Sequence, residues 1–158
     1  MHQKITLRNV ELLDESILLE WANDDEVRRW SWVNNKKISK AEHHSWFSDQ
    51  LRKDSNIIYM FEIDGVPFGC VRFQMSVSEI VLHYLVAKDY RGYGFGKTIV
   101  QIAALNLREN IGDRDIYAYT FSENCASRKS LERAGFIVLS DETRCRYVLP
   151  KCNQVGNI

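Results

Sequence analysis

The order of the predicted elements indicates an α+β layer sandwich, with a mostly antiparallel central sheet flanked by helices. Three observations support this class. Extended runs outnumber helical runs, and several follow one another directly. One crossover unit is also predicted, made of a strand, the glycine loop, a helix and a second strand, and such a unit makes its two strands parallel neighbours. The length of 158 residues is that of one domain. We therefore predict a single domain over residues 1–150 and a tail over residues 151–158.

Composition excludes several classes of protein. Hydrophobic residues make up 45% and charged residues 27%, as in ordinary globular proteins. Lys plus Arg and Asp plus Glu both number 21, so no net charge favours nucleic acid or an anionic membrane. The start lacks the apolar core of a signal peptide, and no later run is long enough for a membrane span, so we expect a cytoplasmic protein. The four cysteines show no Cys-x-x-Cys spacing, which predicts reduced thiols and no metal.

The first third of the chain predicts one strand and three helices. Residues 5–8 alternate apolar and polar side chains, and Asp14 is placed to cap the first helix, over residues 16–21. Residues 23–25 interrupt it and provide a new N-cap for a second short helix before Trp30. Residues 31–37 are predicted to form an exposed loop. Ser39-x-x-Glu42 is a capping box that opens the third helix.

The rest of the chain is predominantly extended. Residues 57–63 and 66–73 are predicted strands joined by Asp64-Gly65, a strong hairpin signal, and residues 79–86 form the next strand. A helix over residues 98–110 ends near Gly112, and residues 116–121 form a strand. A last helix over residues 124–134 stops at Gly135, and residues 136–140 and 143–149 form a closing hairpin.

A glycine-rich loop over residues 91–97 lies between a predicted strand and a predicted helix. Glycine allows main-chain N–H groups to approach a ligand, and a helix N-terminus favours an anion. A Walker A loop needs glycine at the position of Arg91, and a dinucleotide fingerprint needs a third glycine at Lys97 or Ile99, so both templates fail. The remaining interpretations are an acyl-CoA loop and a plain glycine-rich turn.

Two segments resemble motifs of the GNAT acetyltransferases. Arg91-x-x-Gly94-x-Gly96 resembles the acyl-CoA pyrophosphate loop of the family, and residues 124–136 resemble its Asn-x-x-Ser segment ending in Gly-Phe. The resemblance implies the GNAT fold, in which the fourth and fifth strands are parallel and splay apart around the pantetheine arm of acetyl-CoA. It assigns to acetyl-CoA binding Leu85, Val86, Arg91, Gly92, Tyr93, Gly94, Phe95, Gly96, Lys97, Asn124 and Ser127. We expect Gly94 and Gly96 to let the backbone approach the pyrophosphate.

The catalytic groups are less well determined. Leu131 occupies the position where many family members place the tyrosine that protonates the departing thiolate, so we expect Ser127, through water, or a tyrosine to act instead: Tyr84, Tyr117 or Tyr119. Glu79 and His83 lie at i and i+4 of one strand, on the same face, and are candidate general bases. An ordered water as base, and a merely structural His83, remain open. Cys125 as nucleophile is disfavoured against an incidental thiol.

The N-terminal helices are predicted to form the acceptor side. Residues 21–31 and 42–47 resemble segments of nucleotide-sugar acetyltransferases that act on UDP-linked 4-amino sugars in pseudaminic acid synthesis. Aromatic rings can stack on a base or sugar and arginines can bind a diphosphate, which makes acceptor candidates of Arg28, Arg29, Trp30, Trp32 and His43. Trp21, Trp46 and Phe47 are expected in the core.

The predicted function is acetyl transfer from acetyl-CoA to a primary amine, by direct attack. The first choice of acceptor is a nucleotide-linked amino sugar, and the alternatives are protein N-terminal amines and polyamines. From another class, a non-catalytic acyl-CoA-binding module remains open, favoured by the missing tyrosine at Leu131. A homodimer is compatible with the sequence.

Overall fold

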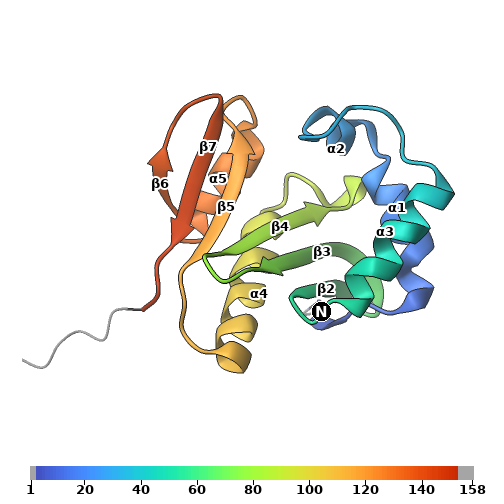
Figure 1. The fold of residues 1–158 in the computed structure, drawn as a ribbon, viewed down its shortest axis with the longest axis horizontal. Coiled ribbons are helices and arrows are strands. Elements are labelled where there is room, and N and C mark those ends of the chain that lie inside the picture. Colours follow the sequence, from blue (N-terminus) through green and yellow to red (C-terminus); the bar gives the residue numbers. More distant parts are fainter. Residues whose placement is uncertain (1–2, 153–158) are drawn as a thin grey trace, which may run out of the picture.

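The computed structural model describes residues 3–152, and its elements follow the predicted order (Figure 1). The strands are β1 (Ile5–Asn9), β2 (Asn56–Ile63), β3 (Val66–Met75), β4 (Ile80–Val86), β5 (Ile116–Phe121), β6 (Ile137–Ser140) and β7 (Arg144–Leu149). The helices are α1 (Glu15–Ala22), α2 (Asp25–Arg29), α3 (Lys40–Arg52), α4 (Phe95–Ile111) and α5 (Cys125–Arg133), with 3-10 turns η1 (Leu12–Asp14) and η2 (Lys88–Tyr90).

All seven strands join one sheet, in the order β1-β2-β3-β4-β5-β7-β6. Every neighbouring pair is antiparallel except β4 and β5, which are parallel. Their pairing covers only Ile80 with Ile116, Val81 with Tyr117 and Leu82 with Ala118. Beyond these pairs the two strands separate, as Figure 1 shows between the central strands and the β5–β7 unit. The predicted α+β fold with a parallel, splayed pair of strands is confirmed.

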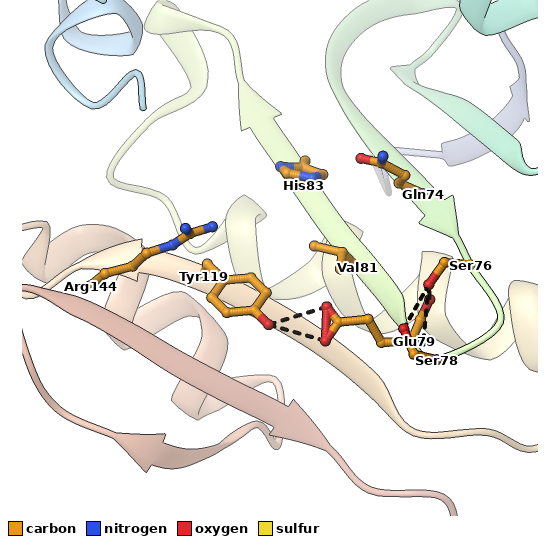
Figure 2. A pocket seen from close by; sticks show the side chains of 8 residues that line it. All are labelled: Gln74, Ser76, Ser78, Glu79, Val81, His83, Tyr119 and Arg144. Carbon is orange, nitrogen blue, oxygen red and sulfur yellow. Dashed lines mark hydrogen bonds between the residues drawn. The ribbon is translucent and has the colours of Figure 1, made fainter. Parts of the chain in front are cut away.

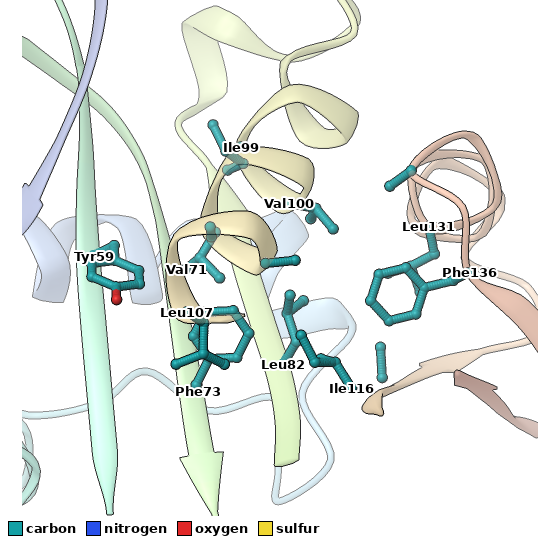
Figure 3. Close-up of a cluster of buried hydrophobic side chains, with 14 of the residues drawn as sticks. Tyr59, Val71, Phe73, Leu82, Ile99, Val100, Leu107, Ile116, Leu131 and Phe136 are labelled. Atoms are coloured by element: carbon teal, nitrogen blue, oxygen red, sulfur yellow. The ribbon is translucent and has the colours of Figure 1, made fainter. Parts of the chain in front are cut away.

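The two faces of the sheet differ in chemistry because side chains alternate along each strand. On β4, Ile80 and Leu82 point into the main core, which α4 and α5 cover. That core contains Leu107 of α4, Leu131 of α5 and Phe136, all almost fully buried (Figure 3). The opposite face carries a second apolar cluster beneath α1 and α3, with Trp21, Phe47 and Met60, while polar and aromatic side chains line its part nearer β5 and β7. Each large side chain in the core stabilises the fold by about 1.5–3 kcal/mol.

Most predicted caps and turns are confirmed. The Asp24 side chain accepts hydrogen bonds from two amides of α2, and Ser39 and Glu42 form the expected capping box on α3. Asp64 and Gly65 take φ angles of 50° and 82°, which is the geometry of a tight hairpin turn. Gly112 follows α4 with a φ of 93°.

Several details of the prediction are wrong. The Asp14 side chain does not cap α1. Its buried carboxylate instead binds the Arg8 guanidinium at 2.8 and 2.9 Å, and helix-capping patterns in the sequence do not predict this ion pair. Helix α4 begins at Phe95 instead of residue 98, because the end of the glycine loop is already helical. Trp46, expected in the core, is 41% exposed, whereas Trp21 and Phe47 are buried as expected. In the predicted tail, residues 153–158 lie outside the described residues.

Candidate active site

The glycine loop leads from η2 into α4. Two different structural requirements explain why glycine occupies positions 92, 94 and 96. Gly92 and Gly94 have φ angles of 84° and 83°, a region that other residues rarely adopt, and Gly94 is the N-cap of α4. Gly96 is required by packing instead, because a Cβ there would lie 2.7 Å from Ser130 Oγ and 3.3 Å from Tyr84 Cε2. The first amides of α4 have no intrahelical partner and remain free for an anion.

Arg91 connects this loop with two other parts of the molecule. Its Nε donates to the Val86 carbonyl at 2.9 Å, at the end of β4. Its Nη1 lies 2.8 Å from Asp24 Oδ1, the carboxylate that caps α2. Although burial opposes ionisation, the Arg91 guanidinium and the α2 amides hold the pKa of Asp24 below its usual value. Arg91 therefore positions the loop. The Val86 carbonyl, which was predicted to bind the cofactor, already accepts a hydrogen bond from Arg91.

The gap between β4 and β5 opens beside this loop. The ladder between the strands ends at Leu82 and Ala118, so the main-chain groups of Tyr84 and Val86 face β5 without pairing to it, whereas those of Leu85 point to Cys70 of β3. On its other edge β4 remains paired with β3 as far as Val86. The arrangement leaves main-chain donors and acceptors along one side of an otherwise fixed strand, which is what the sequence predicted for pantetheine binding.

A cluster of hydroxyl groups lies on the core side of this gap. Burial raises the pKa of Tyr84, while hydrogen bonds with the hydroxyls of Ser127 and Ser130 act in the opposite direction. Ser127 and Ser130 belong to the first turns of α5, which Asn124 caps by accepting from the Ser127 amide at 3.2 Å. Leu131 is 1% exposed and belongs to the core. The structure thus brings together Tyr84 and Ser127, two of the predicted catalytic residues.

A cleft of about 390 Å³ lies on the opposite face of the sheet. Its lining comes from β3, β4, β5 and β7 and includes Gln74, Glu79, Val81, His83, Tyr119 and Arg144 (Figure 2). Glu79 and His83, predicted to share a face, both line it. The two predicted bases therefore face one space, while Tyr84 and Ser127 lie on the other side of the sheet.

Glu79 is held in a small network. Tyr119 donates its hydroxyl to the Glu79 carboxylate, with oxygen separations of 3.1 and 3.2 Å (Figure 2). Arg146 donates to the Tyr119 hydroxyl at 3.2 Å and places a second nitrogen 3.5 Å from Glu79. The carboxylate is thus oriented by its neighbours from β5 and β7.

His83 is a neutral imidazole at neutral pH. Burial lowers its pKa to about 4, and the charges of Arg72 and Arg144 act in the same direction. Arg72 is the direct cross-strand partner of His83, so the two side chains leave the sheet on the same face. His83 can accept a proton, but it is a weak base.

The predicted acceptor residues do not form one group. Arg28 donates to the carbonyls of Ala22 at 2.7 Å and Lys36 at 3.3 Å, so its guanidinium fixes the loop after α2. His43 is 3% exposed and stacks on Phe47, and burial lowers its pKa. Arg28 is engaged by main-chain carbonyls and His43 is buried, which weighs against direct acceptor contact by either side chain.

The tryptophans are better placed. Trp32 is 40% exposed and stacks on Phe121 of β5, with ring centroids 3.7 Å apart. Trp30 lies 6.0 Å from the same ring, and its indole nitrogen donates to Glu26 at 2.8 Å. Arg29 is exposed above the Trp30 ring. Trp32 therefore joins the predicted acceptor layer to the far half of the sheet.

Sequence reasoning missed the arginines in and around the cleft, of which Arg144 lines it. Arg72, Arg144 and Arg146 reach the polar face from β3 and β7. Each alternates with a buried residue of its strand, such as Val71 or Cys145. That alternation was the available signal, but it could not reveal that strands distant in sequence bring the three charges together.

Residues 4–137 match the acetyltransferase (GNAT) domain family. The chain belongs to this family, and the predicted acetyl-CoA-dependent acetyltransferase class is confirmed. A comparison with curated proteins finds no significant match.

Among solved structures, the chain resembles a domain from Methanocaldococcus jannaschii DSM 2661, with a TM-score of 0.82 and 18% identity, over 94% of this chain and 99% of that chain. It also resembles spermidine N-acetyltransferase from Vibrio cholerae in complex with CoA and spermine (TM-score 0.83, 15% identity, 93% and 95% covered). A third likeness is to aminoglycoside acetyltransferase AAC(6')-Ib in complex with coenzyme A (TM-score 0.79, 18% identity, 93% and 95% covered). At these identities the likeness concerns the fold. Within residues 3–152, no helix has the length and apolar character needed to cross a bilayer.

Proposed function

We propose that this acetyltransferase acts on the primary amine of a small molecule that enters the cleft at Glu79 and His83 and attacks the acetyl group directly. The volume of about 390 Å³ is within the range of small-ligand sites. The observation that carries the proposal is the interrupted pairing of β4 and β5, which leaves both strand edges open beyond Leu82 and Ala118, next to His83 of the cleft. An acetyl group and an amine can meet there from opposite faces of the sheet.

The residues on the loop side fit acetyl-CoA, which supplies an acetyl group activated as a thioester. Gly94 leaves open space where a Cβ would point, and α4 directs its first amides toward the loop. The unpaired edge of β4 offers main-chain hydrogen bonds to an extended amide chain. Asn124 caps α5 with its oxygen, which leaves its amide nitrogen to donate. We assign the main-chain groups of Tyr84 and Val86 to the pantetheine arm and the loop to the pyrophosphate.

Proton transfer is assigned to two pairs of residues. In the cleft, His83 and Glu79 accept the proton of the amine; a weak base suffices, because the nitrogen becomes much more acidic once it bonds to carbon. On the core side, Tyr84 keeps its proton at neutral pH and, with Ser127, donates to the departing thiolate. Burial, which raises the pKa of Tyr84, keeps the acid form populated.

Direct attack is favoured over a covalent acyl-enzyme. Cys70 lies beneath the α1 and α3 layer, and burial raises the pKa of its thiol to about 12, so it carries no thiolate at neutral pH. Cys125 is exposed at the start of α5, away from the lining of the cleft. Neither thiol is placed as an activated nucleophile.

Two classes of acceptor compete. Two solved neighbours are a spermidine N-acetyltransferase and an aminoglycoside acetyltransferase, which supports a small polyamine-like acceptor over the nucleotide-linked amino sugar expected from sequence. The engaged Arg28 and buried His43 remove part of the original support for a nucleotide. The exposed ring of Trp32 still supports a nucleotide acceptor, because a base could stack on this ring.

The test combines thiol release with a binding measurement. Acetyl-CoA and a panel of primary amines, including spermidine, kanamycin and amino sugars, should give thiol release above the hydrolysis background with at least one acceptor. No release with any amine, despite tight acetyl-CoA binding, would identify a binding module instead of an enzyme.

The loop assignment is tested with Gly94→Glu and Gly94→Gln. Both introduce similar bulk at a positive φ, but only glutamate adds charge where the pyrophosphate is assigned. We expect calorimetry to show a weaker acetyl-CoA affinity for both and a further loss of at least ~10-fold for glutamate, about 1.4 kcal/mol. Equal affinities for the two variants would reject a phosphate at this position.

A further inference from the structure

Two arginines lie near His83 of the acceptor cleft and come from different strands; Arg144 lines the cleft, and the Arg72 guanidinium lies 5.7 Å from the centroid of the Trp46 ring. Arg72 on β3 is the cross-strand partner of His83, and Arg144 on β7 lines the cleft together with His83. Figure 2 shows the guanidinium end of Arg144 reaching from its strand toward the space between Tyr119 and His83. The positive charges of both side chains therefore act on His83.

Neither arginine is neutralised by the described part of the chain. Over residues 3–152, no carboxylate lies within 4.0 Å of the Arg72 or Arg144 guanidinium, whereas Arg146 beside them has Glu79 at 3.5 Å. Arg72 is also substantially buried, and burial lowers its pKa. A charge withdrawn from water without a counter-charge is unfavourable, so its retention here calls for a partner.

Arg144 is held in a defined orientation. Its guanidinium lies 4.6 Å from the centroid of the Trp32 ring and 4.6 Å from that of Tyr119. Trp32 is itself fixed by stacking on Phe121. Two aromatic rings thus cover the guanidinium without using its N–H groups, which lie in its own plane and form a fork suited to a phosphate or carboxylate.

We propose that Arg72 and Arg144 bind a phosphate group carried by the amine acceptor, so that Arg144 determines acceptor specificity. The inference rests on the proposed function for the identity of the reaction, and it narrows the acceptor to an amine that also bears a negative charge. Two guanidinium groups match the charge and the several acceptor oxygens of a phosphate. A polyamine, the class that the likeness to two solved neighbours favours, would bring further positive charge toward Arg72 and Arg144, so this inference decides against that class.

The kinetic test uses two acceptors with the same amine. Glucosamine 6-phosphate and glucosamine differ by one phosphate, and spermidine serves as the cationic comparison. We expect wild-type kcat/KM to be at least ~10-fold higher for the phosphorylated sugar, the ~1.4 kcal/mol of one charge-assisted contact. Arg144→Gln should remove this preference by raising KM for the phosphorylated sugar while leaving KM for acetyl-CoA unchanged. Arg52→Gln, on the exposed face of α3, is the matched control.

A second measurement does not need turnover. Inorganic phosphate bound beside His83 should raise the imidazole pKa, observed by NMR titration, in wild-type protein and in Arg52→Gln but not in Arg144→Gln. Equal kcat/KM for the two sugars, or a preference for spermidine, would overturn the proposal, as would a phosphate effect on His83 that survives Arg144→Gln. If no amine is acetylated but phosphate still acts on His83 through Arg144, the proposed function fails and the anion site stands.

Discussion

His83 is held as an unprotonated imidazole by its surroundings. Burial removes the water that would stabilise the imidazolium, and the guanidinium groups of Arg72 and Arg144 repel it. The same charges act on any amine placed beside His83, and they favour its neutral, nucleophilic form. If the amine binds there as proposed, its attack is promoted at the scale of single residues by repulsion of positive charge as well as by a base.

This environment predicts a pH-dependent stability. The pKa of His83 is about 4 in the folded protein against 6.5 for the free side chain, so between these values the unfolded chain binds the extra proton. Above pH 6.5 both states are neutral and no cost arises; as pH falls toward 4 the folded state loses stability, at most about 1.4 kcal/mol per pH unit from this group. Urea unfolding of His83→Gln should show a shallower decline.

The same substitution at His44, on the exposed side of α3, controls for the removal of a histidine. Identical pH slopes for wild type and His83→Gln would show that the arginines do not act on His83 as described. A slope that flattens only for His83→Gln would support the electrostatic picture.

Residue identity was a good guide where chemistry is local. Asp24, Ser39 and Gly112 could be assigned from neighbouring residues, because caps depend on contacts within one turn. The roles of Arg28 and His43 could not, since both depend on what the loop and helix pack against. Glu79 and His83, expected on one face because they lie four residues apart, both line the cleft, whereas the arginines from β3 and β7 were missed.

At the scale of elements, α4 and α5 approach so closely that one position must be glycine. The ideal Cβ at Gly96 lies 2.7 Å from Ser130 Oγ, so the contact is between two helices as much as between helix and strand. Sequence identified Gly96 as part of a phosphate loop and missed this packing role. It also placed the start of α4 three residues late, because glycines are poor evidence for helix.

We predict that Gly96→Ala destabilises the protein. Alanine in a helix would gain about 0.5–1 kcal/mol over glycine, but overpacking against Ser130 and Tyr84 costs about 1–3 kcal/mol, so the net change is a loss. A second substitution, Ser130→Ala, removes the oxygen at 2.7 Å and should recover part of the lost free energy of unfolding. Urea unfolding measures both; a Gly96→Ala protein more stable than wild type would contradict the close packing.

At the scale of the whole molecule, the acceptor layer and the cofactor loop are tied by one ion pair. Asp24 belongs to the layer of α1 and α2, Arg91 belongs to the glycine loop, and their contact of 2.8 Å crosses the end of β4. Arg91 also holds the Val86 carbonyl, so the position of the loop depends on a residue of the other layer. A change in one layer can therefore alter binding in the other.

Asp24→Asn separates this link from helix capping, because asparagine caps as well as aspartate. We expect KM for acetyl-CoA to rise by about fivefold, corresponding to a partly buried ion pair of about 1 kcal/mol, although Asp24 lies in the acceptor layer. Asp25→Asn, on the exposed first turn of α2, is the control. Unchanged acetyl-CoA kinetics in Asp24→Asn would show that the loop holds its position without the pair.

The parting of β4 and β5 has a further meaning for the sheet as a whole. Only three residue pairs join the halves, and beyond Leu82 and Ala118 each strand presents an edge that a neighbour would normally complete. Such an edge is satisfied by water or by another extended chain with alternating donors and acceptors. A pantetheine arm, with its two amides, is chemically a short substitute strand. Under the proposed assignment, the arm would therefore bind to the open edge of β4 as an additional strand binds to the edge of a sheet.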